Sequence, residues 1–214
     1  MRAPEADHGH MKQRREKMLS TAYRLFSEKG ITAVRLTDIA EEAGCGKRTL
    51  LHYFDSKAGL VMAVTVWKWN AYFEENRKRR PKVDFEGMTA KEVFEFYLDS
   101  FLELYRGHKD LLCFNQLFNV YIRAEEFDDR SMQPYANVID GLEKQFHIIY
   151  EKGVQDHTIR TDIPEKKMFS TTLHLMLAAV TRYAVGLVYQ PDEGFDDIAE
   201  LEVLKEALLQ KYKA

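Results

Sequence analysis

One short stretch, LTDIAEEAGCGKRTLLHYF between Leu36 and Phe54, constrains the fold of this chain more than any other. Ile39, Ala40 and Ala43 recur at intervals of three and four residues, which gives the first half one apolar helical face. Gly44 follows at the position where many helices end in a left-handed residue. Glycine adopts that conformation without steric penalty because it has no Cβ. We therefore predict a short helix, a tight turn and a second short helix.

The second helix is expected to start at Gly46 or Lys47, and its two faces differ in character. Leu50 and Tyr53 share one face, and Phe54 closes the end. The opposite face carries side chains that can contact phosphates or base edges: Lys47, Arg48, Thr49 and His52. This pattern is typical of a helix-turn-helix, whose second helix enters the DNA major groove. Helix–glycine–helix corners also occur in all-α proteins that never bind DNA, so spacing alone leaves both interpretations open.

The residues around this stretch resemble the TetR family of bacterial transcription factors. The resemblance extends from about Lys17 to Trp67 and consists of the patterns A-x-x-L-F-x-x-x-G, I-A-x-x-A-G and T-L-x-x-Y-F-x-x-K. These patterns fall on Ala22, Leu25, Phe26 and Gly30, then on Ile39, Ala40, Ala43 and Gly44, then on Thr49, Leu50, Tyr53, Phe54 and Lys57. The chain departs from the family at Leu51, where tyrosine is usual, and at Gly46, where serine or threonine is frequent. Its operator is therefore left open.

The resemblance implies an all-α protein of about nine helices, and no stretch of the chain alternates with the period of a strand. We expect an N-terminal three-helix helix-turn-helix domain and a C-terminal helical domain that binds a ligand and dimerises. The expected segments are a disordered tail at 1–11, the DNA-binding domain at 12–56, a connecting helix at 57–81 and the ligand-binding and dimerisation domain at 82–214. Within the last segment, we predict helices near 89–106, 109–125, 131–152, 164–189 and 196–212.

DNA contacts are assigned by the resemblance together with the polar helix face. The residues assigned are Thr37, Lys47, Arg48, Thr49, Leu51, His52, Tyr53 and Lys57. Arg48 is the candidate for a base-edge contact, because arginine can pair bidentately with guanine. Lys57 matches a lysine that family members place on a phosphate. Thr37 is also expected to cap the helix that it precedes.

The distribution of charge supports a polyanionic partner for the N-terminal part only. Residues 1–80 contain 16 Lys and Arg against 10 Asp and Glu, whereas residues 81–214 contain 15 against 24. The balance is therefore +6 in the first part and −9 in the second, within a net charge of −3. A basic head on an acidic body is expected when only the head contacts nucleic acid.

Aromatic residues are frequent in the three helices predicted between 89 and 152. Most of them are expected to form a core, yet this domain encloses a ligand cavity in the family, and aromatic walls with a few polar groups suit one. The candidate ligand-binding residues are Tyr97, Phe101, Phe114, Phe118, Asn119, Tyr121, Phe146 and His174. They favour a small hydrophobic effector.

The last two predicted helices resemble the pair through which family members dimerise as a four-helix bundle. Each has an apolar stripe at helical spacing. The stripe consists of Leu173, Leu177, Val180 and Ala184 on the first helix, and of Leu201, Leu204 and Leu208 on the second. An intramolecular core is the alternative. A homodimer is favoured because helix-turn-helix proteins read paired half-sites with two-fold symmetry.

Other functional classes fit the sequence less well. It contains no P-loop, G-x-G-x-x-G or H-E-x-x-H motif, and its histidines lack ligand spacing, so we expect no catalytic residue, cofactor or metal. A helical adaptor that binds only protein would not need a cationic helix face. The sequence has two cysteines and shows no secretory signal and no uninterrupted apolar span. We therefore expect a cytoplasmic protein that does not bind a membrane. The sequence favours a homodimeric repressor that a small hydrophobic molecule releases from double-stranded operator DNA.

Overall fold

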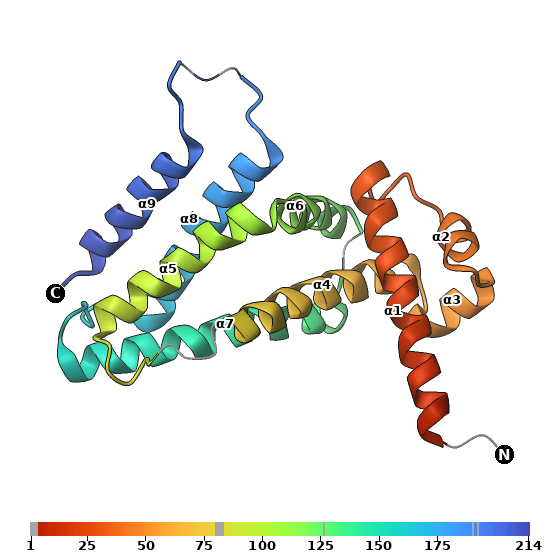
Figure 1. The fold of residues 1–214 in the computed structure, drawn as a ribbon, viewed down its shortest axis with the longest axis horizontal. Coiled ribbons are helices and arrows are strands. Elements are labelled where there is room, and N and C mark those ends of the chain that lie inside the picture. The colour runs from red at the N-terminus through yellow and green to blue at the C-terminus, as the bar shows by residue number, and fades with distance from the viewer. Residues whose placement is uncertain (1–3, 80–83, 126, 190, 192) are drawn as a thin grey trace. The chain divides into compact units, whose positions relative to one another are not determined.

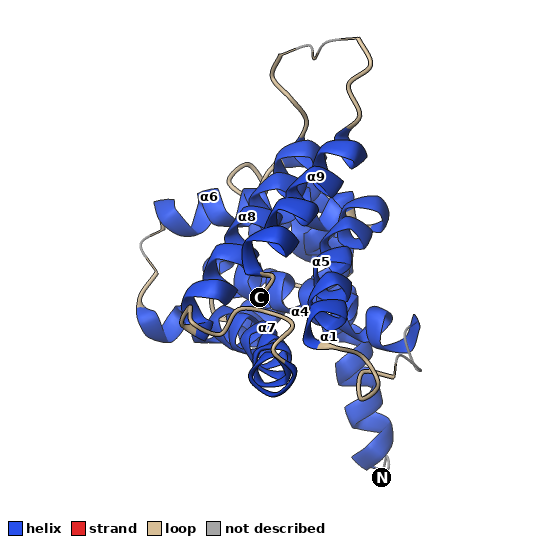
Figure 2. Ribbon diagram, turned by 90° about the vertical axis from the view of Figure 1, so that its left-hand side faces the viewer, coloured by secondary structure: helices blue, strands red, loops and turns tan. Residues whose placement is uncertain are grey.

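The computed structural model describes residues 4–79, 84–125, 127–189, 191 and 193–214. Within these ranges the chain forms nine α-helices and no strand (Figures 1 and 2). The helices are α1 (Pro4–Lys29), α2 (Leu36–Ala43), α3 (Lys47–Phe54), α4 (Lys57–Arg79), α5 (Ala90–Gly107), α6 (Lys109–Ala124), α7 (Asp129–Asp156), α8 (Glu165–Val185) and α9 (Asp197–Tyr212). The predicted all-α fold with an N-terminal helix-turn-helix is confirmed.

Three helix boundaries differ from the prediction. α1 begins at Pro4, so residues 4–11, which we expected to be disordered, are helical. Proline suits the first turn of a helix because the N–H it lacks would have no partner there. α7 continues past Gly153, which is buried against Ile159 and serves close packing rather than ending the helix. α8 ends at Val185 and not near 189, because Gly186 leaves the helical conformation with φ 101°.

The chain divides into two compact units. Unit 1 contains Met1–Asn76 and Phe114–Val138, and unit 2 contains Arg77–Cys113 and Ile139–Ala214. Unit 1 therefore combines the predicted DNA-binding domain with most of α4 and with parts of α6 and α7. The functional boundaries at 56/57 and 81/82 stay a prediction, and residues 80–83, which include the second of them, lie outside the described residues.

Unit 1 is organised around one buried cluster, here called the head core. α1 contributes Met18, Ala22, Leu25 and Phe26. α2, α3 and α4 contribute Ile39, Ala40, Ala43, Leu50, Phe54, Leu60, Val61 and Val64. Phe114, Phe118 and Tyr121 of α6 complete it. α1 lies beside α2, and α2 beside α3 (Figure 1). Burial of each large apolar side chain stabilises this arrangement by about 1.5–3 kcal/mol.

The turn between α2 and α3 has the geometry expected of a glycine helix end. Gly44 has φ 71° and ψ 39°, in the left-handed region. Its N–H donates to the carbonyl of Glu41 at 3.0 Å, and the N–H of Cys45 donates to Ala40 at 2.8 Å. These bonds satisfy carbonyl groups that would otherwise be unpaired at the end of α2. α3 then begins at Lys47, as predicted.

Unit 2 is built on α5, which packs against both α8 and α9. α8 and α9 run side by side in opposite directions and are joined at one end (Figure 1). The N-terminus of α5 carries a capping box, in which Glu92 accepts the Thr89 N–H at 2.7 Å. Asp156 at the end of α7 accepts the N–H of Ala90 at 2.6 Å. On α9, the ammonium group of Lys205 lies 2.6 Å from the carboxylate of Asp99.

Because Gly44 is left-handed and Gly141 is helical, replacing each by alanine should have opposite effects on stability. Gly44→Ala should lower the free energy of unfolding by about 1–2 kcal/mol, because a Cβ disfavours the left-handed conformation. Gly141 lies inside α7, and a Cβ added there would have no heavy atom within 4 Å. Gly141→Ala should therefore raise that free energy by about 0.5–1 kcal/mol. Urea denaturation followed by circular dichroism would measure both, and a neutral Gly44→Ala would contradict the assigned turn.

Candidate functional site

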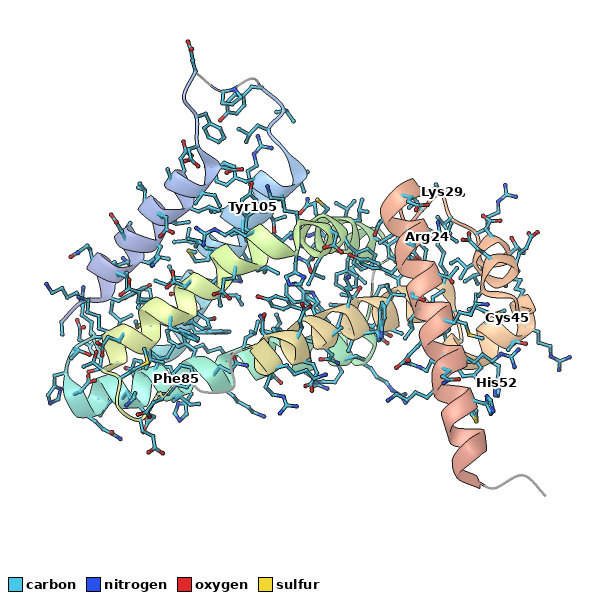
Figure 3. The ribbon with its side chains drawn as sticks, viewed as in Figure 1. Arg24, Lys29, Cys45, His52, Phe85 and Tyr105 are labelled. Carbon is cyan, nitrogen blue, oxygen red and sulfur yellow. The ribbon has the colours of Figure 1, made fainter. Side chains whose placement is uncertain are left out.

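The polar face of α3 is exposed because the opposite face is anchored in the head core. Leu50 and Phe54, four residues apart, are 1% and 5% exposed. The helix therefore cannot rotate without exposing two large apolar side chains. Lys47, Arg48 and His52 are exposed, while Thr49, Leu51 and Tyr53 are half-buried at the edges of that face. Figure 3 shows His52 on α3 and Cys45 in the turn before it.

Thr37 is exposed near the start of α2 but does not cap the helix as we predicted. Arg35 occupies the cap position, and its backbone N–H donates to the Asp38 carboxylate at 3.1 Å. The Thr37 hydroxyl donates to the same carboxylate at 3.3 Å. Asp38 therefore satisfies the free N–H at the helix start, which leaves Thr37 at the surface, where a DNA contact stays a prediction.

Lys57 begins α4 and is held close to the protein. Its ammonium group donates to the carbonyl of Thr32 at 3.1 Å and lies 6.0 Å from the centre of the Tyr121 ring. Burial lowers the pKa of Lys57, an effect that the nearby Glu125 opposes. Burial and Glu125 together raise the pKa of Tyr121 to about 12. Lys57 therefore links α4 to the loop after α1 and to α6, a role that the sequence did not indicate.

Basic residues of α1 have two different roles. The guanidinium of Arg15 lies 5.4 Å from the centre of the Phe54 ring, where it contacts the end of α3. Arg24 donates to Glu28 at 2.9 Å and forms an ion pair with Glu42 of α2 (Figure 3). Arg24 is thus neutralised by two carboxylates and connects α1 to α2. Sequence reasoning missed this residue, because the spacing between Arg24 and Glu42 has no local signature.

The candidate effector residues are divided between the two units. Phe114, Phe118 and Tyr121 are buried in the head core of unit 1, and this packing accounts for them. Asn119 and His174 are exposed, and the His174 ring nitrogen lies 3.4 Å from the Ser170 hydroxyl. Tyr97, Phe101 and Phe146 form an aromatic cluster in unit 2, with ring centres 5.5 Å and 5.7 Å from Tyr97.

Asn115 is buried in unit 1 and acts as a shared hydrogen-bond acceptor. Its side-chain oxygen accepts the indole N–H of Trp69 at 3.2 Å and the hydroxyl of Tyr135 at 3.3 Å. Asn115 is 1% exposed and Trp69 is 6% exposed. This network joins α4, α6 and α7, so it stabilises unit 1 rather than presenting a free polar group.

Unit 2 contains two polar groups that the sequence did not single out as a pair. The hydroxyls of Tyr97 on α5 and Thr172 on α8 are buried, and neither has a hydrogen-bond partner among the described residues. Leaving such a group unpaired costs about 1–3 kcal/mol. Phe169 extends the aromatic cluster, with its ring centre 5.7 Å from that of Phe146. Sequence patterns mark Phe169 and Thr172 as one face of a helix but cannot show an unpaired hydroxyl.

The stripe predicted to form a dimer contributes largely to the core of unit 2. Leu173, Val180, Leu201 and Leu208 are buried within the single chain. Leu177, Ala184 and Leu204 are half-buried. Packing within the single chain accounts for the burial of these four residues, because α8 and α9 pack against α5 and against each other, and a part for the stripe in a dimer stays a prediction. The large apolar side chains that remain exposed on these helices are Leu175, Val185 and Val203, at 45%, 53% and 66%.

Two kinds of feature, a cluster of metal-binding side chains and a helix that could cross a membrane, are absent from the described part of the chain. It contains no group of three or more His, Cys, Asp or Glu side chains that could hold a metal ion. None of the helices in that part combines the length and hydropathy that a membrane crossing requires.

Comparison with known proteins shows which protein family the N-terminal residues match. The family model for bacterial regulatory proteins of the tetR family matches residues 18–64. The chain is 28% identical over 171 residues to the uncharacterized HTH-type transcriptional regulator YerO of Bacillus subtilis, an alignment that spans 78% of this chain and 57% of YerO. It is 24% identical to the HTH-type transcriptional repressor KstR2 of Rhodococcus jostii, over 87% of this chain and 88% of that protein.

A solved structure shows the same fold over nearly the whole chain. The transcriptional regulator FadR from Bacillus subtilis, in complex with stearoyl-CoA, superimposes with a TM-score of 0.67. The two sequences are 18% identical, and the match covers 91% of this chain and 97% of that chain. This likeness extends the resemblance beyond residues 18–64 to the arrangement of the remaining helices.

The shared acceptor in unit 1 predicts the effect of its removal. Asn115→Ala should lower the free energy of unfolding by about 1–3 kcal/mol, because Trp69 and Tyr135 would lose a buried acceptor. Gln116 is the exposed neighbour on α6, and Gln116→Ala should change stability by less than about 0.5 kcal/mol. Thermal unfolding would compare the two variants. Equal stabilities would show that the network contributes little.

Proposed function

We propose that this chain, a member of the TetR family of bacterial transcriptional regulators through its residues 18–64, is a repressor that a small hydrophobic molecule releases from its operator. The observation that carries the DNA-binding part is the exposed face of α3, with Lys47, Arg48 and His52 on a helix anchored from behind. The repressor role is supported by the likeness to KstR2, which is named as a repressor. We expect the protein to act in the cytoplasm, where operator DNA lies.

In this proposal α3 enters the major groove, and the two ends of the helix-turn-helix contact the backbone. Arg48 reads a base edge, while Lys47, Thr49, Leu51, His52 and Tyr53 contact phosphates or groove walls. Thr37 and Lys57 flank the groove at the starts of α2 and α4. The bond from Lys57 to Thr32 fixes its position before DNA arrives, which reduces the entropy lost on binding a phosphate.

We further propose that two copies associate through the exposed faces of α8 and α9. Leu175 and Ala178 of α8 and Val203 and Ala207 of α9 are all exposed, and the spacings within each pair place both members on one helix face. Small and apolar exposed residues on two adjacent helices suit close packing against a second copy. A dimer is also what paired operator half-sites require. The half-buried Leu177, Ala184 and Leu204 would lie at the margin of this interface.

The effector is proposed to bind in unit 2, where Tyr97, Phe101 and Phe146 gather. The likeness to FadR in complex with stearoyl-CoA supports a hydrophobic effector of this kind. Release requires that the effector prefer the conformation with low DNA affinity. To change operator occupancy from 99% to 1%, it must bind that conformation about 10⁴-fold more tightly.

One arginine variant and one lysine variant test the assignment of α3 to the DNA major groove. Arg48→Ala should relax sequence preference, with a loss of about 1–3 kcal/mol of discrimination at one base pair. Lys47→Ala should instead weaken binding to all sequences alike and reduce the salt slope by about one unit. Fluorescence anisotropy with operator and scrambled DNA at several salt concentrations would separate these effects. Lys167→Ala, an exposed lysine on α8 of unit 2, serves as the control and should bind like the parent. Parent-like binding by both α3 variants would contradict the assignment.

The dimer interface is tested by charges placed on exposed residues. The double variant Leu175→Arg and Val203→Arg should fold, because both side chains are exposed in the single chain. It should dissociate, because burying unpaired charges between two copies costs several kcal/mol, on the order of 3–5. Sedimentation equilibrium would measure the change. Ile148→Arg on α7, where the side chain is 57% exposed, is the matched control and should leave the dimer intact. A dimer that survives the double variant would place the interface elsewhere.

A further inference from the structure

The two unpaired hydroxyls of unit 2 are exceptions within the part of the chain that the structure describes. Thr65 on α4 is also fully buried, and its hydroxyl donates to the carbonyl of Val61, one turn earlier, at 2.9 Å. Thr172 on α8 makes no such bond. Tyr150 on α7 donates to the carbonyls of Thr161 and Ile163 at 2.9 Å and 3.0 Å, whereas the Tyr97 hydroxyl has no acceptor among the described residues. Buried polar groups in native proteins are nearly always paired, so both exceptions call for an explanation.

Tyr97 is a member of one aromatic cluster, and Thr172 lies one helical turn from another member, Phe169. The ring of Tyr97 lies 5.7 Å from that of Phe146, which in turn lies 5.7 Å from that of Phe169. Thr172 follows Phe169 by three residues on α8, so both project from the same side of the helix, and both are buried. Phe101 contacts Tyr97 from the next turn of α5, at 5.5 Å. Rings supplied by α5, α7 and α8 therefore connect Tyr97 with the buried face of α8 that carries Thr172.

The charge of the surroundings restricts what these hydroxyls can bind. The buried polar or charged residues in the described part of the chain are Thr65, Asn115, Thr172 and Thr181, so that part has no buried Lys, Arg, Asp or Glu side chain. Burial raises the pKa of Tyr97, which keeps its hydroxyl neutral and able to donate. A carboxylate brought here would be buried without a cation, at high cost in free energy. A neutral oxygen would not incur that cost.

We propose that the Tyr97 and Thr172 hydroxyls bind a neutral carbonyl oxygen of the effector, while Phe101, Phe146 and Phe169 contact its hydrocarbon body. A carbonyl oxygen has two lone pairs and can accept from both donors. The ligand class is thus an uncharged, largely apolar carbonyl compound. Because the hydroxyls are buried, the ligand reaches them by displacing side chains of the cluster. This inference rests on the proposed function, since it specifies the effector of that regulator.

Three probes of nearly equal shape test the ligand class. These are 4-butylacetophenone, which carries a neutral carbonyl, 4-butylbenzoate, which carries a carboxylate, and 1-butyl-4-isopropylbenzene, which carries no polar group. Isothermal titration calorimetry on the full chain should show that the ketone binds at least tenfold more tightly than either of the others. A preference for the carboxylate, equal binding of ketone and hydrocarbon, or no binding of any probe would overturn the inference.

Variants of the two hydroxyls test the anchor itself. Tyr97→Phe and Thr172→Val should each weaken ketone binding about tenfold and leave hydrocarbon binding unchanged. Neither should lower the melting temperature of the free protein, because each removes a buried group that has no partner. Variants that melt lower and still bind the ketone like the parent would show a structural role and overturn the inference.

Tyr150→Phe is the matched control on α7. Its hydroxyl has two carbonyl acceptors, so its loss should lower the melting temperature and leave ketone affinity unchanged. If Tyr150→Phe weakens ketone binding as much as Tyr97→Phe, the hydroxyl of Tyr97 has no special part in binding, and the inference fails.

Operator binding by the same preparations separates the two proposals. Salt-dependent DNA binding by the parent together with a failed ketone test would overturn only the ligand class. A parent that does not bind DNA would contradict the proposed function instead, whatever its affinity for the ketone.

Discussion

The anchoring of α3 by Leu50 and Phe54 is the contact on which the rest of unit 1 depends. These two side chains fix which face of a two-turn helix points outward, and a helix this short would not persist in water without tertiary packing. The polar face is therefore a consequence of the apolar one. The helices that build the head core, α1, α2, α3, α4 and α6, can be understood as covering that pair of side chains and the small alanines of α2 that let α1 approach.

Much of unit 1 could be predicted from sequence because its signals are local. The Gly44 turn and the start of α3 at Lys47 each depend on residues within one or two turns. The role of α6 could not be predicted in this way. Phe118 and Tyr121 look alike whether they line a cavity or fill a core, and only the distant helices that surround them decide between the two.

The same limit applies to α8 and α9. Helical spacing correctly identified Leu173 and Leu208 as members of an apolar stripe, but a stripe does not specify its partner. The structure assigns both residues to the interior of unit 2 and leaves the less conspicuous Leu175 and Val203 at the surface. The start of α1 was missed for another reason. Residues 4–11 lack apolar periodicity, and their helical state follows from continuity with the strongly periodic turns after Met18.

The positions of the tryptophans have a consequence for spectroscopy. The chain has two tryptophans, Trp67 and Trp69, and both belong to α4 within unit 1. The indole of Trp69 is hydrogen-bonded to Asn115, and the ring centre of Trp67 lies 6.4 Å from that of Tyr23. Emission excited at the red edge of the indole band therefore arises from unit 1 alone, whereas far-ultraviolet ellipticity sums over both units. Non-coincident denaturation curves from the two signals would reveal an intermediate in which one unit remains folded without the other.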